Sequence, residues 1–403
     1  MQFCPSLLIR IAYPSIKIAQ NYQQARKLGL PILITPWDPL NPIWALTQHY
    51  FSPIFCFLTT NLPPPLCHLF DFIYYSTIDW NFHSRYSAHT PFDFYAPAFL
   101  IVSPGDTQLI ISDTDASEDI LSRVRKDFIK PKAMYGPLEI FGPNVDSVNG
   151  EDWARHRRIT APPFNERNSG LVWKESLRQA SGMLRSWMRK GPKGVENTSN
   201  ETMALALHVL TAAGFGKTYE FDSGVQKIST GHSMSYRDAL KMVLGNLYGA
   251  IITSALFMNL PDFLTPSGVR KIKAAVIEFK IYMFEMVEEE KKTIRNRDGE
   301  KDNLMSVLLR SSQSESEGKG RTALNDEEIF GNLFIYNLAG HDTTANTLAY
   351  AITLLSADRK CQDWIGEEVE AVFSGREHVE DWEYENAFPK LKRCLALMVC
   401  QLR

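Results

Sequence analysis

The chain has 403 residues, a net charge of −3 at neutral pH, 44% hydrophobic residues and 22% charged residues. This is the composition of a globular protein with one large domain or two ordinary ones. There is no global basic excess, so the composition gives no support to a nucleic-acid partner. None of the six cysteines is in C-x-x-C spacing. They therefore suggest neither a zinc site nor a redox motif, and we expect free thiols in a reducing compartment.

Residues 1–80 form a region rich in proline and aromatic side chains. The apolar residues at its start do not resemble a cleavable signal, because they are interrupted by Arg10, Pro14 and Lys17. From Pro39 to Phe70 the chain has no Asp, Glu, Lys or Arg, yet several prolines break any helix there. A spanning helix needs about 20 mostly apolar residues. We therefore predict that this stretch lies at a membrane interface or is buried.

A small β element and a large helical part follow. Residues 98–103 and 107–112 are β-prone and flank a Pro-Gly-Asp turn signal, which predicts a hairpin. Asp115 is the expected N-cap of a short helix after it. A polar linker rich in Ser and Gly is expected at 311–322. Helical patterns occur at 150–160, 168–190, 198–213, 236–258, 267–297, 302–312, 325–357, 359–373 and 388–403. The fold class is therefore mainly α with a small β element, with residues 81–403 as one domain.

The segment 325–357 predicts the most informative helix. Asn325 can cap it, and Glu328 stands where its side chain reaches back to the cap. Leu324 and Ile329 fit a hydrophobic staple across that first turn. Apolar residues recur on most faces of the segment, which indicates a buried helix. At 1.5 Å per residue it is about 50 Å long, enough to cross a domain.

The six residues that start at Ala339 are A-G-H-D-T-T, in the middle of this helix. Gly340 weakens a helix, and a buried Asp342 needs a partner. Thr343 can turn its hydroxyl onto the carbonyl of Ala339, open the helix locally and so form a groove for a small ligand. An acid beside an alcohol can also pass protons. The alternative is a helix crossing at the glycine. No metal site is predicted, because His341 and its neighbour point about 100° apart.

A second constellation lies upstream in the segment 150–158. Trp153 and Arg157 are four positions apart, so they share one helical face. An indole N–H beside a guanidinium fork suits a carboxylate. The alternative is a solvated basic face formed by residues 155–158, with the tryptophan in the core.

Together the two motifs, A-G-x-D-T-T in a long internal helix and W-x-x-x-R upstream, resemble the cytochrome P450 family. The hairpin, the linker before the long helix and the helix after it are also similar to that family. Residues 386–398 look like the start of its K helix, and the resemblance covers about residues 80–398. The amino-acid sequence is most similar to those of fungal microsomal members of the family. The resemblance implies a P450-like fold and a haem-dependent monooxygenase of secondary metabolism, which inserts one oxygen atom of O2 into a lipophilic substrate.

The resemblance also implies roles for single residues. Trp153 and Arg157 would hold a propionate of haem b. Ala339 and Gly340 would lie over the haem, with the glycine marking a kink. Asp342 and Thr343 would deliver protons to dioxygen at the haem. The family's iron carries an axial cysteine thiolate, which favours O–O cleavage.

The family's partners and location are expectations of the same kind. Electrons would come from NADPH through NADPH–cytochrome P450 reductase, which would dock near Arg155 and Arg158. The location would be the cytosolic face of the endoplasmic reticulum membrane, or the cytoplasm, since the family's usual N-terminal anchor is not recognised. A membrane surface is therefore a further expected contact, beside the lipophilic substrate and O2.

Two departures from the family pattern stand near the last residues. Arg403 fits the arginine of the K-helix E-x-x-R pair, but Cys400 stands at the glutamate position. The haem loop F-x-x-G-x-R-x-C-x-G is not found, and no cysteine has that context. We therefore expect a fold that is incomplete at the C-terminus, with the axial cysteine beyond the chain, unproductive haem binding and poor solubility. The competing hypothesis is a non-catalytic P450 remnant that acts as a helical binding or scaffold protein.

Overall fold

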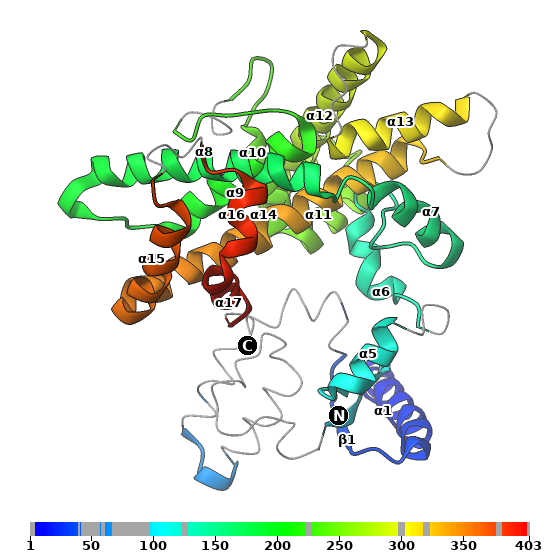
Figure 1. Cartoon of the computed structure of the whole chain (residues 1–403). Coiled ribbons are helices and arrows are strands. Elements are labelled where there is room, and N and C mark those ends of the chain that lie inside the picture. Colours follow the sequence, from blue (N-terminus) through cyan, green and yellow to red (C-terminus); the bar gives the residue numbers. More distant parts are fainter. Residues whose placement is uncertain are drawn as a thin grey trace. The chain divides into compact units, whose positions relative to one another are not determined.

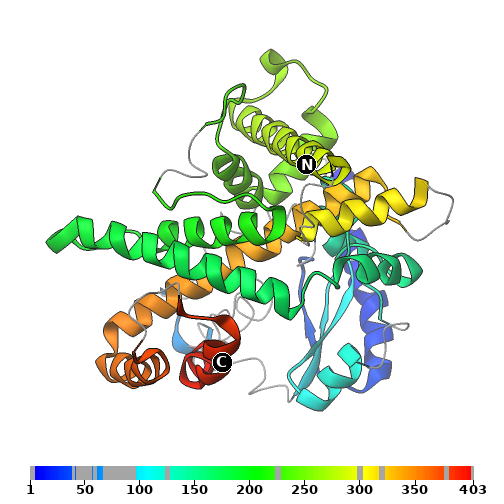
Figure 2. The same ribbon diagram turned by 45° about the horizontal axis from the view of Figure 1, so that its top comes forward.

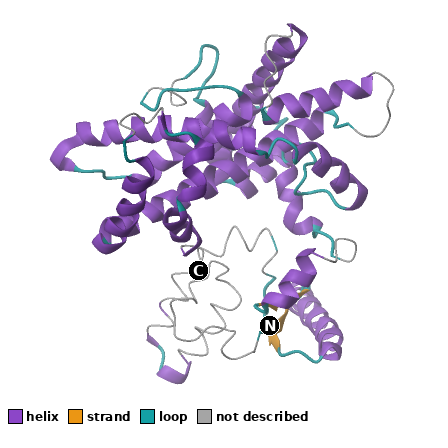
Figure 3. Ribbon diagram, in the orientation of Figure 1, coloured by secondary structure: helices purple, strands orange, loops and turns teal. Residues whose placement is uncertain are grey.

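The chain is seen in a computed structural model, which divides it into two compact units, Met1–Met134 and Tyr135–Arg403 (Figure 1). The described residues are 5–38, 41, 57, 61–66, 97–122, 128–222, 228–296, 303–316, 323–375 and 381–400. The predicted domain boundary at residue 80 lies outside them, as do Arg403 and most of the interfacial stretch 39–70. Strands occur only in the first unit, within the described part of the chain, and helices dominate the second (Figure 3).

The first unit is built on a three-stranded sheet. Helix α1 (Pro5–Ala25) precedes strand β1 (Ile32–Ile34), which pairs parallel with β2 (Ala98–Val102). Strand β2 pairs antiparallel with β3 (Thr107–Ile111), in the register Leu100 opposite Leu109, so the predicted hairpin is confirmed. Helix α1 and strand β1 were not expected from the sequence. Strand β1 is only three residues long and its partner lies far along the chain, which a local pattern cannot indicate.

The sheet is buried on both faces of its central strand. Leu100 and Val102 pack with Ala25 of α1 on one face, while Phe99 and Ile101 pack with Leu33 on the other. Because both faces are covered, β2 is a continuous apolar run rather than an alternating one.

Helix α5 (Thr114–Ser122) follows the hairpin. Its first turn is capped by Asp113, whose Oδ1 accepts a hydrogen bond from the N–H of Ala116 at 2.8 Å. The prediction of Asp115 as the N-cap is therefore wrong by two residues. Both aspartates precede the same apolar residues, so the spacing alone does not choose between them.

The second unit is helical. After α6 (Lys132–Tyr135) and the turn η3 (Gly136–Glu139), its helices are α7 (Gly150–Thr160), α8 (Glu166–Lys190), α9 (Thr198–Phe215), α10 (Tyr236–Gly245), α11 (Leu247–Ile252), α12 (Ser267–Asn296), α13 (Leu304–Ser316), α14 (Asp326–Ala357), α15 (Arg359–Phe373), α16 (Tyr384–Ala387) and α17 (Lys392–Cys400). Helices α9 and α14 pack along each other and α8 packs along α9 (Figure 2).

Three predicted helices differ from the structure by more than two residues at a boundary. The predicted helix 236–258 is broken at Asn246, a poor helix former after a glycine, and it ends in a π-helical turn, η5 (Thr253–Phe257). The predicted helix 388–403 begins only at Lys392, because Pro389 lies in the preceding 3₁₀ turn, η8 (Phe388–Lys390). Helix α13 runs to Ser316, into the segment predicted as a linker.

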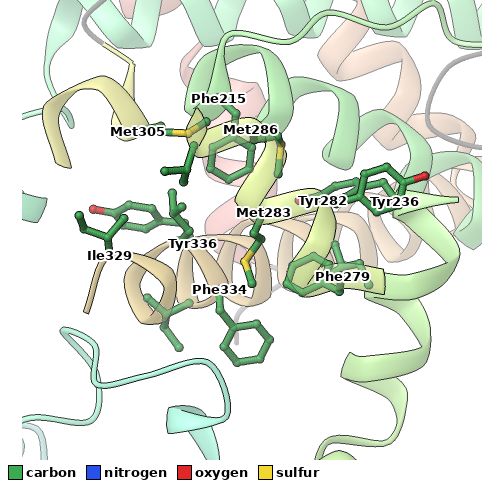
Figure 4. Packing of buried hydrophobic residues seen from close by; sticks show 14 of the residues in the cluster. Phe215, Tyr236, Phe279, Tyr282, Met283, Met286, Met305, Ile329, Phe334 and Tyr336 are labelled. Carbon is green, nitrogen blue, oxygen red and sulfur yellow. The ribbon is translucent and has the colours of Figure 1, made fainter. Parts of the chain in front are cut away.

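The main core lies where α9, α10, α12, α13 and α14 meet (Figure 4). Phe279 and Met283 of α12 and Phe334 of α14 are fully buried there. A polar contact crosses this core: the hydroxyl of Tyr236 donates to Oδ1 of Asn337 at 2.6 Å. Burial raises the pKa of Tyr236, so the phenol stays neutral and the hydrogen bond satisfies both side chains.

Within the described residues, no single helix combines the length and apolar composition needed to cross a bilayer. By those two criteria alone, the bent pair formed by α10 and the segment Leu247–Phe257, which meet at 95°, would qualify.

Candidate active site

The A-G-H-D-T-T motif lies where α14 changes from a buried helix to an accessible one. The turns before it are buried, whereas Ala339 and Thr343 are exposed one turn apart. Oγ1 of Thr343 donates a hydrogen bond to the carbonyl oxygen of Ala339 at 2.6 Å, as predicted from the sequence. This bond engages the hydroxyl hydrogen and leaves the oxygen lone pairs available as acceptors.

Gly340 allows a close helix crossing. A Cβ atom there would lie 3.0 Å and 3.3 Å from the two methyl carbons of Leu210 on α9. The crossing considered as an alternative therefore exists, beside the accessible Thr343. The expected opening of the helix does not appear as a break, because α14 is continuous α-helix from Asp326 to Ala357.

The two titratable residues of the motif lie in different surroundings. His341 is only 2% exposed, and burial lowers the pKa of its imidazole to about 4, with a further lowering by the charge of Arg237. The ring is therefore neutral at neutral pH. Asp342 is half-buried at the edge of the accessible turn. The carboxyl group next to Thr343 is thus partly open to solvent, and the imidazole is not.

Helix α7 carries the second motif. Trp153 is half-buried and Arg157 is exposed one turn later. At the end of α7, the carbonyl of Thr160 accepts a hydrogen bond from the Tyr336 hydroxyl at 3.3 Å. Burial raises the pKa of Tyr336, while that hydrogen bond and the charge of Arg157 act in the opposite direction. Arg157 is therefore an electrostatic neighbour of a residue that lies about one turn before Ala339 on α14, so the structure links the two motifs through Tyr336.

The basic residues of α7 do not form one solvated face. Arg157 and Arg158 are exposed, but His156 is fully buried. The side chain of Arg155 is only 19% exposed and forms an ion pair with Glu328 on α14. The docking role expected of Arg155 does not fit this position, because its guanidinium is committed within the chain. Arg158 remains accessible.

A wide apolar groove of about 810 Å³ opens beside the motif. Its walls are parallel stripes from three helices, formed by Val172, Ala180 and Met183 of α8, Leu205, Val209 and Ala213 of α9, and Gly340, Thr344, Leu348 and Ile352 of α14. Most of these residues recur every four positions, so each helix presents one continuous stripe. Sequence reasoning missed the groove, although the nearly unbroken apolar run of α9 is a signal that this helix meets neighbours on all sides.

A family model for cytochrome P450 matches residues 62–395 of the chain. The chain belongs to the cytochrome P450 family. A cytochrome P450 monooxygenase of Penicillium roqueforti, named ORF6, is 32% identical over 383 residues, which are 92% of this chain. A cytochrome P450 monooxygenase of Penicillium rubens, named prx9, has the same identity and coverage. The chain spans 63% of the length of each of these two P450 relatives.

Other comparisons support the same fold and a fungal kinship. A cytochrome P450 monooxygenase of a phomenoic acid biosynthesis cluster in Leptosphaeria maculans is 26% identical over 98% of this chain and 69% of its own length. Among solved structures, a zebrafish cytochrome P450 with progesterone matches 84% of this chain and 70% of its own, with a TM-score of 0.58 and 17% identity. The P450-like fold class and the resemblance to fungal members are therefore confirmed.

The described residues of this P450 fit two sides of a haem. Arg157 offers an exposed guanidinium, and Trp153 shares its helical face, as a propionate requires. The turn from Ala339 to Thr343 offers an accessible surface to the haem plane, and its one charged residue, Asp342, lies at the edge. Two free cysteines, Cys361 and Cys394, lie within the described residues and are the thiols to consider as iron ligands.

One of these two cysteines lies in surroundings that disfavour a thiolate ligand. Burial, together with the nearby carboxylate of Glu368, raises the pKa of the Cys394 thiol, and so disfavours its thiolate. Cys361 lies in the first turn of α15 and is half-buried, beside its N-cap Asp358. The described residues thus offer groups for a haem propionate and for the haem face, and Cys394 is a poor candidate for the axial ligand.

Proposed function

We propose that the protein works as a haem-dependent monooxygenase that inserts one oxygen atom of O2 into a lipophilic organic substrate. The observation that carries the proposal is the exposed Thr343 hydroxyl, which donates to the carbonyl of Ala339 at the point where α14 changes from a buried helix to an accessible one. A bound haem supplies the redox chemistry that activates dioxygen. Membership of the P450 family supports the reaction class, and the relatives named as monooxygenases support it further.

The residues of the chain have separate tasks in this proposal. Arg157 binds a haem carboxylate, with Trp153 as a second donor on the same face. Asp342 takes protons from solvent, since its carboxyl group is half-buried at the edge of the turn. Thr343 would receive a proton at Oγ1 from Asp342 and would pass the hydrogen that it now shares with the Ala339 carbonyl to dioxygen at the haem.

We propose a membrane-bound setting for the same activity, on the cytosolic face of the endoplasmic reticulum, with electrons from NADPH through a reductase. Large apolar side chains support it, because Leu256, Phe263 and Leu264 are 66%, 82% and 59% exposed in the segment between α11 and α12. Exposed apolar side chains that are neighbours in sequence suit contact with lipid. Arg158 remains available for an acidic redox partner.

Haemin binding tests the proposed site. The purified chain is titrated with haemin and followed by visible absorbance, with far-UV circular dichroism as the check of folding. We expect the variant R157A to bind haemin about tenfold more weakly than the unmodified chain. R158A, the exposed neighbour, is the matched control and should bind normally. A folded chain that takes up no haemin, or binds it equally after R157A, would overturn the assignment and favour the non-catalytic scaffold hypothesis.

The carbon monoxide spectrum tests the iron ligand. The surroundings of Cys394 disfavour a thiolate, and no cysteine of this chain stands in the haem-loop pattern F-x-x-G-x-R-x-C-x-G. We therefore expect the ferrous carbon monoxide complex of this chain to lack the thiolate-type spectrum. A stable thiolate-type spectrum from the purified chain would contradict this expectation. It would also direct attention to the remaining cysteines, which are best tested by single Cys→Ser variants.

A further inference from the structure

A cluster of polar side chains that hydrogen-bond to one another joins α7 to the start of α14. The guanidinium of Arg155 binds the carboxylate of Glu328 with both arms, at 2.9 Å from Nη1 to Oε2 and at 2.5 Å from Nη2 to Oε1. Nη1 also donates to the carbonyl of Ala323 at 2.7 Å. Burial alone would raise the pKa of Glu328, but hydrogen bonds from Arg155 and from the N–H of Asn325 outweigh it and lower the pKa to about 2.

His156, the residue after Arg155 on α7, belongs to the same cluster. The N–H of Val145 donates to Oδ1 of Asn332 at 3.0 Å, which fixes the orientation of that amide. Nδ2 of Asn332 then faces Nδ1 of His156 at 3.0 Å, so this ring nitrogen is the acceptor. The proton is therefore on Nε2, which lies 3.4 Å from Oε1 of Glu328. Burial lowers the pKa of His156, so the ring stays neutral.

These contacts fix the rotation of α7 about its own axis. Successive residues of an α-helix are 100° apart, so residues two positions apart point about 200° apart. Trp153 and Arg157 are each two positions from Arg155. When Arg155 is held against α14, the other two side chains must point to the opposite side of α7. Arg157 is exposed, as expected of a side chain that points away from this contact with α14.

We propose that Arg155 and Glu328 are positioning residues: their bidentate ion pair sets the roll of α7 and so presents Trp153 and Arg157 to the carboxylate of the prosthetic group. The proposal rests on the haem site proposed above. A planar fork determines direction as well as distance, so lysine at position 155 keeps the charge but not the geometry. The pair thus acts through Arg157 and touches no ligand itself.

Double-variant haemin titrations test this role. We expect R155K to weaken haemin binding about tenfold. The matched control is R178K, which breaks another bidentate pair, the one between Arg178 and Glu175 on α8. R178K should lower the urea midpoint by a similar amount and change haemin affinity less than about twofold. In the R157A background, R155K should change affinity by less than about threefold, because it acts mainly through Arg157.

The outcomes separate the two proposals. Haemin binding by R155K at the strength of the unmodified chain would overturn the positioning role and leave the haem site intact. The same loss in the R157A background as in the unmodified chain would also overturn it, since it would show an effect independent of Arg157. Unchanged binding by R157A itself would overturn the haem site and the positioning role together. If R155K does not fold, R155M combined with E328L removes both charges at once and should show the same loss of affinity.

Discussion

At the scale of single residues, buried histidines make the stability of the second unit depend on pH. Burial, followed by the charge of Arg237, lowers the pKa of His208 to about 4. Burial also lowers the pKa of His341 to about 4, although the charge of Asp342 acts in the opposite direction. The unfolded chain binds these protons from about pH 6.5 downward, whereas the folded chain does not until about pH 4. The stabilisation is therefore complete above pH 6.5 and is lost as the pH falls towards 4.

We expect the free energy of unfolding to drop by about 2 kcal/mol for each of these histidines between pH 7 and pH 5. Urea unfolding at the two pH values measures this, with circular dichroism as the signal. H208Q keeps a polar partner for Gln179. It should reduce the drop in unfolding free energy between the two pH values by the contribution of one histidine. A midpoint that is the same at both pH values, or a pH dependence unchanged in H208Q, would show that these rings are not the cause.

The residues of the site were predictable where their signal is local. The capping box of Asn325 and Glu328 and the bond from Thr343 to Ala339 connect positions three or four apart, and the structure shows both. The partner of Arg155 was not predictable, because Glu328 lies 173 positions away and is already explained by its capping role. The sequence indicates only the partner of Glu328 that is near in the chain, Asn325, and not the distant one, Arg155.

At the scale of elements, helix existence followed from the 3.6-residue pattern, and the ends of several helices followed from it too. Helices α7 and α15 begin and end where they were predicted, after Asn149 and Asp358. Helix α1 was missed: its residues were weighed only as a possible signal segment, and the helix contains Pro14. The break at Asn246 was missed for the opposite reason, since apolar residues continue through it.

The second turn of α14 approaches the loop at residues 142–143 closely enough to require glycine. A Cβ atom on Gly331 would lie 2.3 Å from the carbonyl oxygen of Pro143 and 2.4 Å from that of Gly142. These are backbone atoms, so no side chain can move aside. We expect G331A to lower the free energy of unfolding by about 2–4 kcal/mol, because the loop must separate from the helix.

The control for this element is another helical glycine. Gly366 lies within α15, and a Cβ atom there would meet nothing within 4 Å. G366A should therefore raise stability by about 0.5–1 kcal/mol through helix propensity alone. Thermal or urea unfolding of both variants measures the difference. Equal effects of the two substitutions would mean that α14 and the 142–143 loop are not in the tight contact described.

At the scale of the whole second unit, α8, α9 and α14 pack as three helices around a groove that none of them fills. Each contributes an apolar stripe, and several stripe residues, among them Leu205 and Met183, also belong to a satellite core cluster. A groove of this kind leaves apolar surface accessible, which promotes association. We predict that this groove is the surface through which the chain would associate, which is where we place the poor solubility expected from the sequence.

The groove gives a prediction that two adjacent residues can test. Val172 and Leu171 are neighbours on α8 with similar exposure, 40% and 50%, but only Val172 lines the groove. The apolar dye ANS binds accessible apolar surface and becomes fluorescent. We expect V172K to reduce ANS fluorescence and concentration-dependent association, because it places a charge inside the groove. L171K adds the same charge one position away and should change neither. If both variants reduce fluorescence equally, the dye reports general surface charge, and the groove is not the sticky surface of the molecule.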